Sequence, residues 1–293
     1  MRAALLALLL QGCALAQLGE DLSAFYSNPA LVTAELVSDA PIQVALLDSP
    51  GFMENHGSQG LWQPVSFVRE VRGGLYMLGA YDPAKLPVLF VHGAGGTPHD
   101  WRAFIAKLDP EKYQAWVYYY PTGLPIETSA LRLDRFVNAL HSEYRFPRLI
   151  VAAHSMGGLV ARRFLALNAG AGRDYQTMLV TLATPFGGVP FASLGVRLVP
   201  YSIPSWSDLS PDSVFLRTLH AQPLPAGVKH HLFFGYRQDG DAFDSDGVIT
   251  VGSQLEGHAG AGAQRHGFKT DQSAILEDPS VLARFAAVLA DFD

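Results

Sequence analysis

The sequence predicts an α/β protein built on a doubly wound, mostly parallel β-sheet. Short, uninterrupted apolar runs recur along the chain, and such runs are typical of strands buried on both faces of a parallel sheet. Segments with apolar residues at positions i, i+3, i+4 and i+7 lie between these runs and indicate amphipathic helices. Strands that alternate with helices in this way form right-handed βαβ crossovers. The 293 residues, 49% of them hydrophobic, suffice for one large domain of this kind.

The elements follow one another in a regular order. Six segments are expected to be strands because they are apolar or aromatic and are bounded by turn residues: residues 75–78, 88–91, 115–120, 149–153, 178–182 and 231–234. Four segments are expected to be helices because they show one apolar face or a helix-start signal: residues 97–108, 133–140, 157–167 and 278–289. Residues 264–268 also have the pattern of a last strand.

Two regions depart from this alternation. Residues 186–228 are rich in Pro, Ser and Gly, and an insertion there would either close over a site as a lid or only cover the core. Both interpretations stay open, because its apolar residues suit either. Residues 17–73 are expected to be an N-terminal extension packed on the main domain at residues 74–293. Within that extension, residues 54–60 have the composition of a polar turn.

Residues 1–16 are typical of a secretion signal. A short basic start precedes an apolar stretch at residues 3–10 that is too short to cross a bilayer. One processing site resembles a bacterial lipobox, in which Cys13 would become the lipidated N-terminus, and its sequence is Leu10-Gln11-Gly12-Cys13. A competing site, Ala14-Leu15-Ala16, fits ordinary cleavage before Gln17. We therefore expect a lipoprotein of the bacterial cell envelope, attached to the membrane through Cys13, or a secreted protein.

Composition excludes some classes of protein. The net charge is −6 and the basic residues form no cluster, which argues against nucleic acid as a partner. Cys13 is the only cysteine, so the chain has no intramolecular disulfide and its stability must come from its core.

Ser155 lies between the strand at residues 149–153 and the helix at residues 157–167, in the sequence Ala153-His154-Ser155-Met156-Gly157. A sharp strand-to-helix turn raises a serine hydroxyl above the sheet, and it needs small residues two positions before and after the serine. Ala153 stands where glycine is commonest and is still small. The N-terminus of the following helix favours negative charge beside the serine. Ser155 is therefore the predicted nucleophile.

A glycine-rich loop follows the strand at residues 88–91, with the sequence His92-Gly93-Ala94-Gly95-Gly96. Such a loop can donate backbone N–H groups to the oxyanion that forms when a serine attacks a carbonyl carbon. The predicted donors are Ala94, from this loop, and Met156, which follows the serine. The loop lacks the Lys-Ser/Thr end of a phosphate-binding P-loop.

These motifs resemble those of bacterial lipases and esterases of the α/β-hydrolase superfamily, especially the lipase-like branch that includes the GPI inositol-deacylase relatives. The resemblance covers roughly residues 74–290 and rests on residues 81–83, 87–93, 96–98, 153–160 and 184–188. It implies an α/β-hydrolase fold, a mostly parallel doubly wound sheet with a lid-like insertion. It also implies ester hydrolysis without a metal or an organic cofactor. The substrate is not identified by fold.

The triad acid is expected after the strand at residues 231–234. Asp246 begins the stretch Asp246-Gly247-Val248-Ile249, which is similar to the stretch that holds the triad acid in related lipases, and Asp244 is held in reserve. A carboxylate there would accept the ring N–H of the histidine and stabilise the imidazolium. Several acids in one loop are also typical of a solvated turn or, less often, of a Ca²⁺ site; no metal site is predicted.

The histidine departs from the pattern of the family. The resemblance places the base at Gln272, and an amide cannot take the proton of a serine near neutral pH. Three alternatives follow. His266 is the predicted base, although a strand at residues 264–268 would hold its side chain within the sheet, below the level of the Ser155 hydroxyl. His258, in a glycine-rich loop, is the second alternative, and loss of the base is the third.

Two functions are therefore open. In the first, the chain is a serine esterase or lipase that cleaves a small-molecule or lipid ester through an acyl-enzyme, with Ser155, Asp246 and His266 as the triad. In the second, it is a catalytically impaired hydrolase fold with a binding or scaffolding role in the cell envelope, and Gln272 is the residue that motivates this alternative.

Overall fold

The computed structural model describes residues 42–52, 54–170, 175–190, 203–256 and 262–292. The lipobox cysteine Cys13 and the alternative base His258 lie outside these residues. No helix in the described part of the chain is long and apolar enough to cross a membrane.

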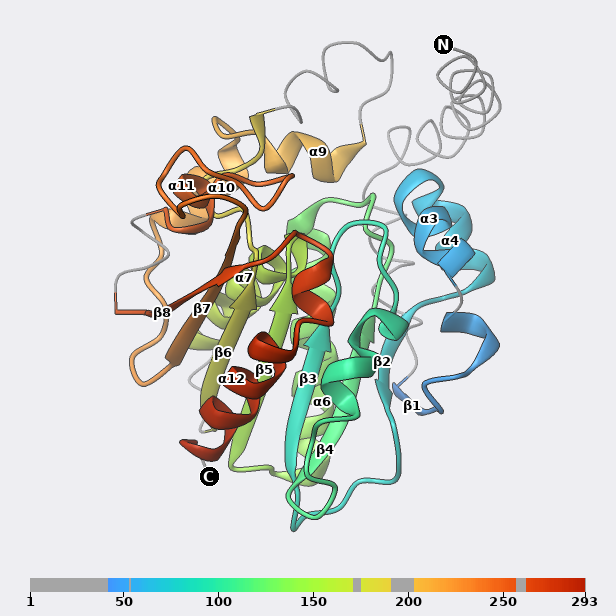
Figure 1. Ribbon diagram of the computed structural model, residues 1–293. Coiled ribbons are helices and arrows are strands. Elements are labelled where there is room, and N and C mark those ends of the chain that lie inside the picture. Colours follow the sequence, from blue (N-terminus) through green and yellow to red (C-terminus); the bar gives the residue numbers. More distant parts are fainter. Residues whose placement is uncertain (1–41, 53, 171–174, 191–202, 257–261, 293) are drawn as a thin grey trace.

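Within the described residues, an eight-stranded sheet forms the centre of the molecule (Figure 1), with the order β1-β2-β4-β3-β5-β6-β7-β8. Only β2 and β4 pair antiparallel; every other neighbouring pair is parallel. The strands are β1 (Ile42–Val44), β2 (Gly74–Met77), β3 (Leu86–Val91), β4 (Tyr113–Tyr119), β5 (Arg148–His154), β6 (Gln176–Leu182), β7 (Lys229–Tyr236) and β8 (Gln264–Lys269). The doubly wound, mostly parallel sheet that the sequence predicts is confirmed.

Helices cover both faces of this sheet, with α12 in front of it and α6 and α7 behind it in Figure 1. The helices are α3 (Glu54–Trp62), α4 (Pro64–Glu70), α5 (Arg102–Ile105), α6 (Ile126–Tyr144), α7 (Met156–Gly170), α9 (Pro204–Leu209), α10 (Val214–His220), α11 (Val251–Gln254) and α12 (Pro279–Ala290). Short 3-10 helices lie at η1 (Pro50–Phe52), η2 (Pro98–Trp101) and η3 (Ala274–Leu276).

The apolar run of β3 explains why the core has two halves. Leu89 and Val91 point to one face and join the helices α6 and α7 in one cluster. Val88 and Phe90 point to the other face and pack with Phe104 and with α12. Successive side chains of a strand alternate between faces, so a strand buried on both sides must be apolar at every position.

Two segments outside the regular alternation meet above the carboxyl ends of the strands. The helix α3 comes from the N-terminal extension, and α9 comes from the segment between β6 and β7. Trp62 at the end of α3 packs edge-to-face on Trp206 of α9, with ring centroids 5.5 Å apart. The expectation of a polar turn at residues 54–60 is wrong, because those residues form most of α3. Tertiary packing, described below, overrides the low helix propensity of its glycines.

Candidate active site

Ser155 lies directly after β5 and before α7, on the turn that the motif predicts. Its φ angle is 53°, which is strained for a residue with a side chain. Two hydrogen bonds fix this conformation: Ser155 N–H donates to Leu182 O at 2.8 Å, and Gly158 N–H donates to Ser155 O at 2.9 Å. A Cβ on Gly157 would lie 2.4 Å from His92 O, so the turn needs a glycine there to bring α7 against β3.

Two N–H groups of the glycine-rich loop after β3 are engaged, and so is that of the following Thr97. Gly95 N–H donates to Thr122 Oγ1 at 2.9 Å, Gly96 N–H donates to Gly93 O at 3.1 Å, and Thr97 N–H donates to Asp100 Oδ2 at 3.1 Å. The described residues provide no partner for Ala94 N–H or Met156 N–H. These two N–H groups are therefore available to an anion that forms beside Ser155.

Ser155 and this loop line one cavity of about 530 Å³. Its wall holds few apolar side chains, among them Val248 and Leu276, and an ion pair between Arg102 and Glu277. The lining residues are Gly93, Ala94, Gly95, Gly96, Thr97, Asp100, Arg102, His154, Ser155, Val248, Gln272, Ser273, Leu276 and Glu277. The volume lies in the range that binds small organic ligands.

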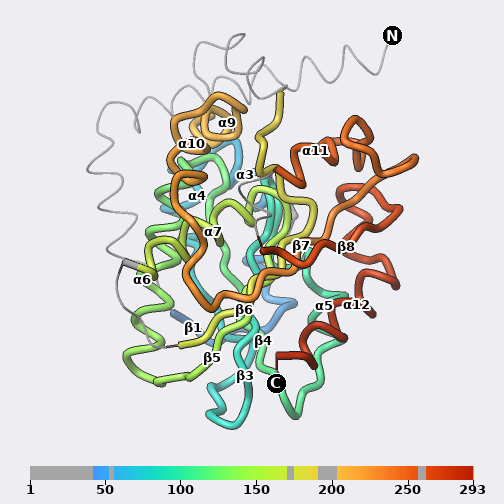
Figure 2. Tube along the Cα trace, turned by 90° about the vertical axis from the view of Figure 1, so that its left-hand side faces the viewer, coloured from blue at the N-terminus to red at the C-terminus, as the bar shows by residue number. Residues whose placement is uncertain are grey.

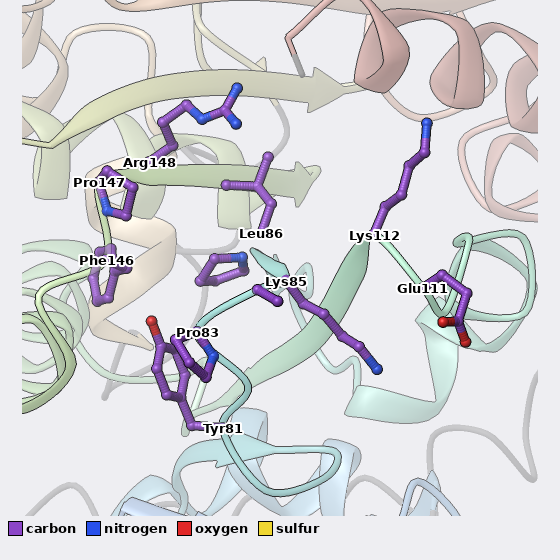
Figure 3. A pocket seen from close by; sticks show the side chains of 11 residues that line it. Tyr81, Pro83, Lys85, Leu86, Glu111, Lys112, Phe146, Pro147 and Arg148 are labelled. Atoms are coloured by element: carbon purple, nitrogen blue, oxygen red, sulfur yellow. The ribbon is translucent and has the colours of Figure 1, made fainter.

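A second cavity, shown in Figure 3, lies at the amino-terminal ends of the central strands. Leu86 and Arg148, at the first positions of β3 and β5, line it together with Lys112. Ser155 follows the other end of β5. The cavity in Figure 3 is therefore separate from the one that contains the serine.

Asp246 is fully buried in the loop after β7. Its Oδ1 accepts N–H bonds from Val248 at 2.9 Å and from Ile249 at 2.8 Å, and its Oδ2 has no partner among the described residues. Burial raises the pKa of the Asp246 carboxyl, and the two N–H bonds oppose this shift. Its main-chain carbonyl accepts Gln272 N–H at 3.0 Å, so the two segments lie side by side.

Asp244, the reserve acid, has a different role in the same loop. Its carboxylate accepts backbone N–H bonds from Gln238 at 2.8 Å and from Gly240 at 2.9 Å, among others. Desolvation acts to raise the pKa of this carboxyl, but the N–H donors outweigh it and lower the pKa to about 2. Asp244 therefore shapes the loop that holds Asp246. Among the described residues, no three histidine, cysteine or acidic side chains are grouped as metal ligands.

Gln272 stands where the resemblance expects the base, and its side chain is buried on the wall of the cavity. Its Nε2 lies 3.5 Å from Ala183 O, at the limit of a hydrogen bond, and its Oε1 has no partner among the described residues. Two acceptor oxygens, Asp246 Oδ2 and Gln272 Oε1, are thus buried without donors in adjacent segments. Buried oxygens without a donor cost folding free energy, so this part of the cavity wall lacks two hydrogen-bond donors among the described residues.

His266, the base predicted from the sequence, is not brought to Ser155. It lies within β8, and the strand registers align His266 with Phe233, Leu182 and His154 across four strands. Three strand spacings of about 4.8 Å separate its backbone from that of His154 by roughly 14 Å.

Both ring nitrogens of His266 are also engaged. Arg284 Nε donates to Nδ1 at 3.1 Å, and Nε2 lies 3.2 Å from His231 Nδ1. Partial burial, with Arg284 and His231 nearby, lowers the pKa of His266 to about 4. The ring is therefore neutral near pH 7, and its one lone pair already accepts a hydrogen bond.

The structure brings another histidine, His154, to the cavity wall. Its Nε2 lies 2.8 Å from Gln272 O, and because a carbonyl only accepts, Nε2 carries the proton. Burial lowers the pKa of His154 to about 4, so the ring is neutral. The sequence contained no signal for this contact, since it joins residues that are 118 positions apart.

Comparison with known proteins decides the family. The family described as "Alpha/beta hydrolase family" matches residues 88–289, which is more than half of the chain. The chain belongs to the α/β hydrolase family. No match was found among curated proteins.

Solved structures show the same fold in bacterial relatives of this α/β hydrolase. The mature form of the lipase BlEst2 from Bacillus licheniformis has a TM-score of 0.60 at 18% identity, over 73% of this chain and 97% of that one. Its propeptide form has a TM-score of 0.56 at 17% identity, over 72% and 53%. The lin2722 product of Listeria innocua has a TM-score of 0.54 at 14% identity, over 71% and 95%. At these identities the likeness shows the fold, and the relation to GPI inositol-deacylases stays a prediction.

Proposed function

We propose that this α/β hydrolase is a serine ester hydrolase in which Ser155 forms an acyl-enzyme. One observation carries the proposal: a strained serine between β5 and α7 shares a cavity with Ala94, whose N–H group has no other partner among the described residues. Strain of this kind persists only where the surrounding structure maintains it, and it is typical of functional sites.

The reaction would run in two halves. Ser155 Oγ attacks the ester carbonyl carbon, and the N–H groups of Ala94 and Met156 stabilise the oxyanion. The alcohol leaves with a proton, and water then attacks the acyl-enzyme and releases the acid. The cavity of about 530 Å³, with its polar wall, suits an ester with a short acyl chain.

The proton of Ser155 needs an acceptor in this mechanism. Asp246 Oδ2 has no donor among the described residues, so it could orient a histidine from outside them, whereas the Nε2–H of His154 is bonded to Gln272 O instead. The ring of His266 is engaged in β8, so two histidines are left for the experiment to separate: His154 on the cavity wall and His258, outside the described residues.

A second function is favoured by Gln272. With an amide on the cavity wall in place of imidazole, the protein would bind an ester-like ligand and turn it over only slowly. This is the binding or scaffolding role on a hydrolase fold.

Labelling and hydrolysis distinguish the two functions. The purified protein is treated with a fluorophosphonate probe and assayed with p-nitrophenyl esters of increasing chain length, beside Ser155→Ala as control. Serine hydrolysis predicts labelling at Ser155 and turnover that Ser155→Ala abolishes. Absence of both from the folded parent would reject the hydrolase proposal in favour of the binding role.

The base is identified with three further variants. Either His154→Gln or His258→Ala should lower the rate by roughly 10²-fold or more, the usual contribution of a general base. His266→Ala should stay within a few-fold of the parent. A loss of activity in His266→Ala alone would show that β8 rearranges in the active protein.

We also propose that Cys13 carries a lipid and anchors the enzyme in a bacterial cell envelope. The proposal rests on the lipobox-like segment. Cys13→Ala should release the protein from the membrane fraction. Membrane association that is unchanged by this substitution would leave cleavage before Gln17 and secretion as the alternative.

A further inference from the structure

The helix α3 of the N-terminal extension packs directly on the glycine-rich loop, at the position of Gly57. A Cβ at Gly57 would lie 2.3 Å from Gly95 O, 2.9 Å from Thr97 Cγ2 and 3.0 Å from Gly96 O. Two of these three atoms belong to the main chain, which cannot swing away as the end of a long side chain does. The helix therefore meets the loop backbone to backbone, and only glycine permits this approach.

The same helix is joined to the loop that follows β4. Gly123 N–H donates to Gly60 O at 2.9 Å, and a Cβ at Gly123 would lie 2.2 Å from Leu61 O. Thr122, in this second loop, is buried, and its Oγ1 accepts Gly95 N–H at 2.9 Å. The glycine-rich loop is thus contacted by α3 and hydrogen-bonded to Thr122. Figures 1 and 2 show α3 at the same end of the molecule as α9.

This arrangement engages the N–H group that follows Ala94. Gly95 has a φ of 68°, and its N–H is taken by Thr122, while its carbonyl lies against Gly57. Ala94, one residue earlier, keeps an N–H group without a partner among the described residues. A shift of the Gly95 carbonyl away from α3 would strain the Gly95 N–H bond to Thr122, and a displacement of that intervening peptide would move the Ala94 N–H group, one peptide unit earlier.

We propose that α3 belongs to the active site, with Gly57 and Thr122 as positioning residues that keep Ala94 N–H directed toward the oxyanion. The inference rests on the proposed function, because it concerns the same reaction. A displacement of about 1 Å in a catalytic group can lower a rate by about 10²-fold. Loss of one oxyanion donor costs about 10²–10³-fold in kcat.

Gly57→Ala is the direct test. Alanine is the better helix former, so α3 itself tolerates the change, and the added methyl group must push the loop. We expect kcat on a p-nitrophenyl ester to fall by about 10–100-fold, with KM within about twofold of the parent. Gly51→Ala is the matched control, because a Cβ at Gly51 meets nothing within 4 Å, and it should have the activity of the parent.

A second pair of variants covers the case in which Gly57→Ala does not fold. Thr122→Val keeps the shape and removes the acceptor of Gly95 N–H, whereas Thr122→Ser keeps the hydroxyl. We expect Thr122→Val to lose about tenfold in kcat and in affinity for a boronic-acid transition-state analogue, and Thr122→Ser to restore both.

The outcomes separate this inference from the proposed function. A parent that neither labels at Ser155 nor hydrolyses esters overturns both. An active parent overturns the role of α3 alone if folded Gly57→Ala and Thr122→Val keep its kcat and its affinity for the analogue. A fall of the melting temperature without a fall of kcat would show that these contacts serve stability only.

Discussion

Gln272→His should raise the activity of this hydrolase, because it puts an imidazole at the position that lacks a base. Gln272 lines the cavity beside Ser155, and its main-chain N–H is already bonded to Asp246. Asp246 Oδ2 has no donor among the described residues, so it can accept the Nδ1–H of a histidine there. The substitution replaces one buried side chain by another of similar size.

The size of the gain follows from the role of the new ring. A positioned general base contributes roughly 10²–10⁴-fold, which is about 3–5 kcal/mol of transition-state stabilisation. The aspartate should add to this, since it orients the ring and stabilises the imidazolium. If neither His154 nor His258 serves as a base in the parent, kcat/KM for a p-nitrophenyl ester should rise by at least about 10²-fold; if one of them does, the gain should be smaller.

The assay compares Gln272→His with Gln272→Asn, which changes the same side chain without supplying a base. The gain should depend on the neutral imidazole, so the rate of Gln272→His should rise with pH through the region near 6.5. Adding Asp246→Asn to Gln272→His should remove most of the gain. The reasoning is refuted if folded Gln272→His is no faster than Gln272→Asn, because the ring then has no path to the Ser155 hydroxyl.

Three further predictions concern stability and local structure. Gly158→Ala should lower the free energy of unfolding in urea by about 1–3 kcal/mol, since its Cβ would lie 1.9 Å from Thr184 Oγ1 and 2.8 Å from Thr184 Cβ; equal stability would mean that the main chain at Thr184 can shift without cost. His92 and His154 are buried, and burial lowers the pKa of each to about 4. The unfolded chain therefore binds more protons than the folded one between pH 6.5 and 4, so the free energy of unfolding should fall over this range, by roughly 2 kcal/mol per ring at pH 5. A free energy of unfolding in urea that does not change with pH would contradict these values. Asp244→Ala removes the acceptor of several backbone N–H groups, so amide exchange at Gln238 and Gly240 should accelerate, whereas Asp241→Asn should change it less.

The central sheet could be predicted from the sequence because its strands carry an unmistakable pattern. Residues 88–91 and 149–153 are wholly apolar, since β3 and β5 are buried on both faces. The turn that holds Ser155 could be predicted equally well, because the short motif around Ser155 dictates its local geometry. Asp246 could be placed in the loop after β7, but its burial and its unpartnered oxygen depend on distant segments.

The histidine and the N-terminal extension were harder to predict for a physical reason. Whether His266 ends a strand or lies within it depends on pairing with β7, which no local pattern reveals. The helix α3 contains Gly57 and Gly60, so propensity argues against a helix there. Gly57 is explained by the backbone of the glycine-rich loop that it approaches, and that backbone comes from residues far along the chain.

The contact between Gly57 and Gly95 also couples the motion of two distant segments. Side chains can usually change rotamer and absorb a small displacement between packed elements, but two main chains in direct contact leave no such slack. Any ligand or partner that tilts α3 should therefore move the glycine-rich loop in the same step. Trp62 of α3 packs on Trp206 of α9, so a movement of α9 should also be transmitted through α3 to the glycine-rich loop. Events on the outer surface of these helices could in this way adjust the reactivity of Ser155 without contacting it.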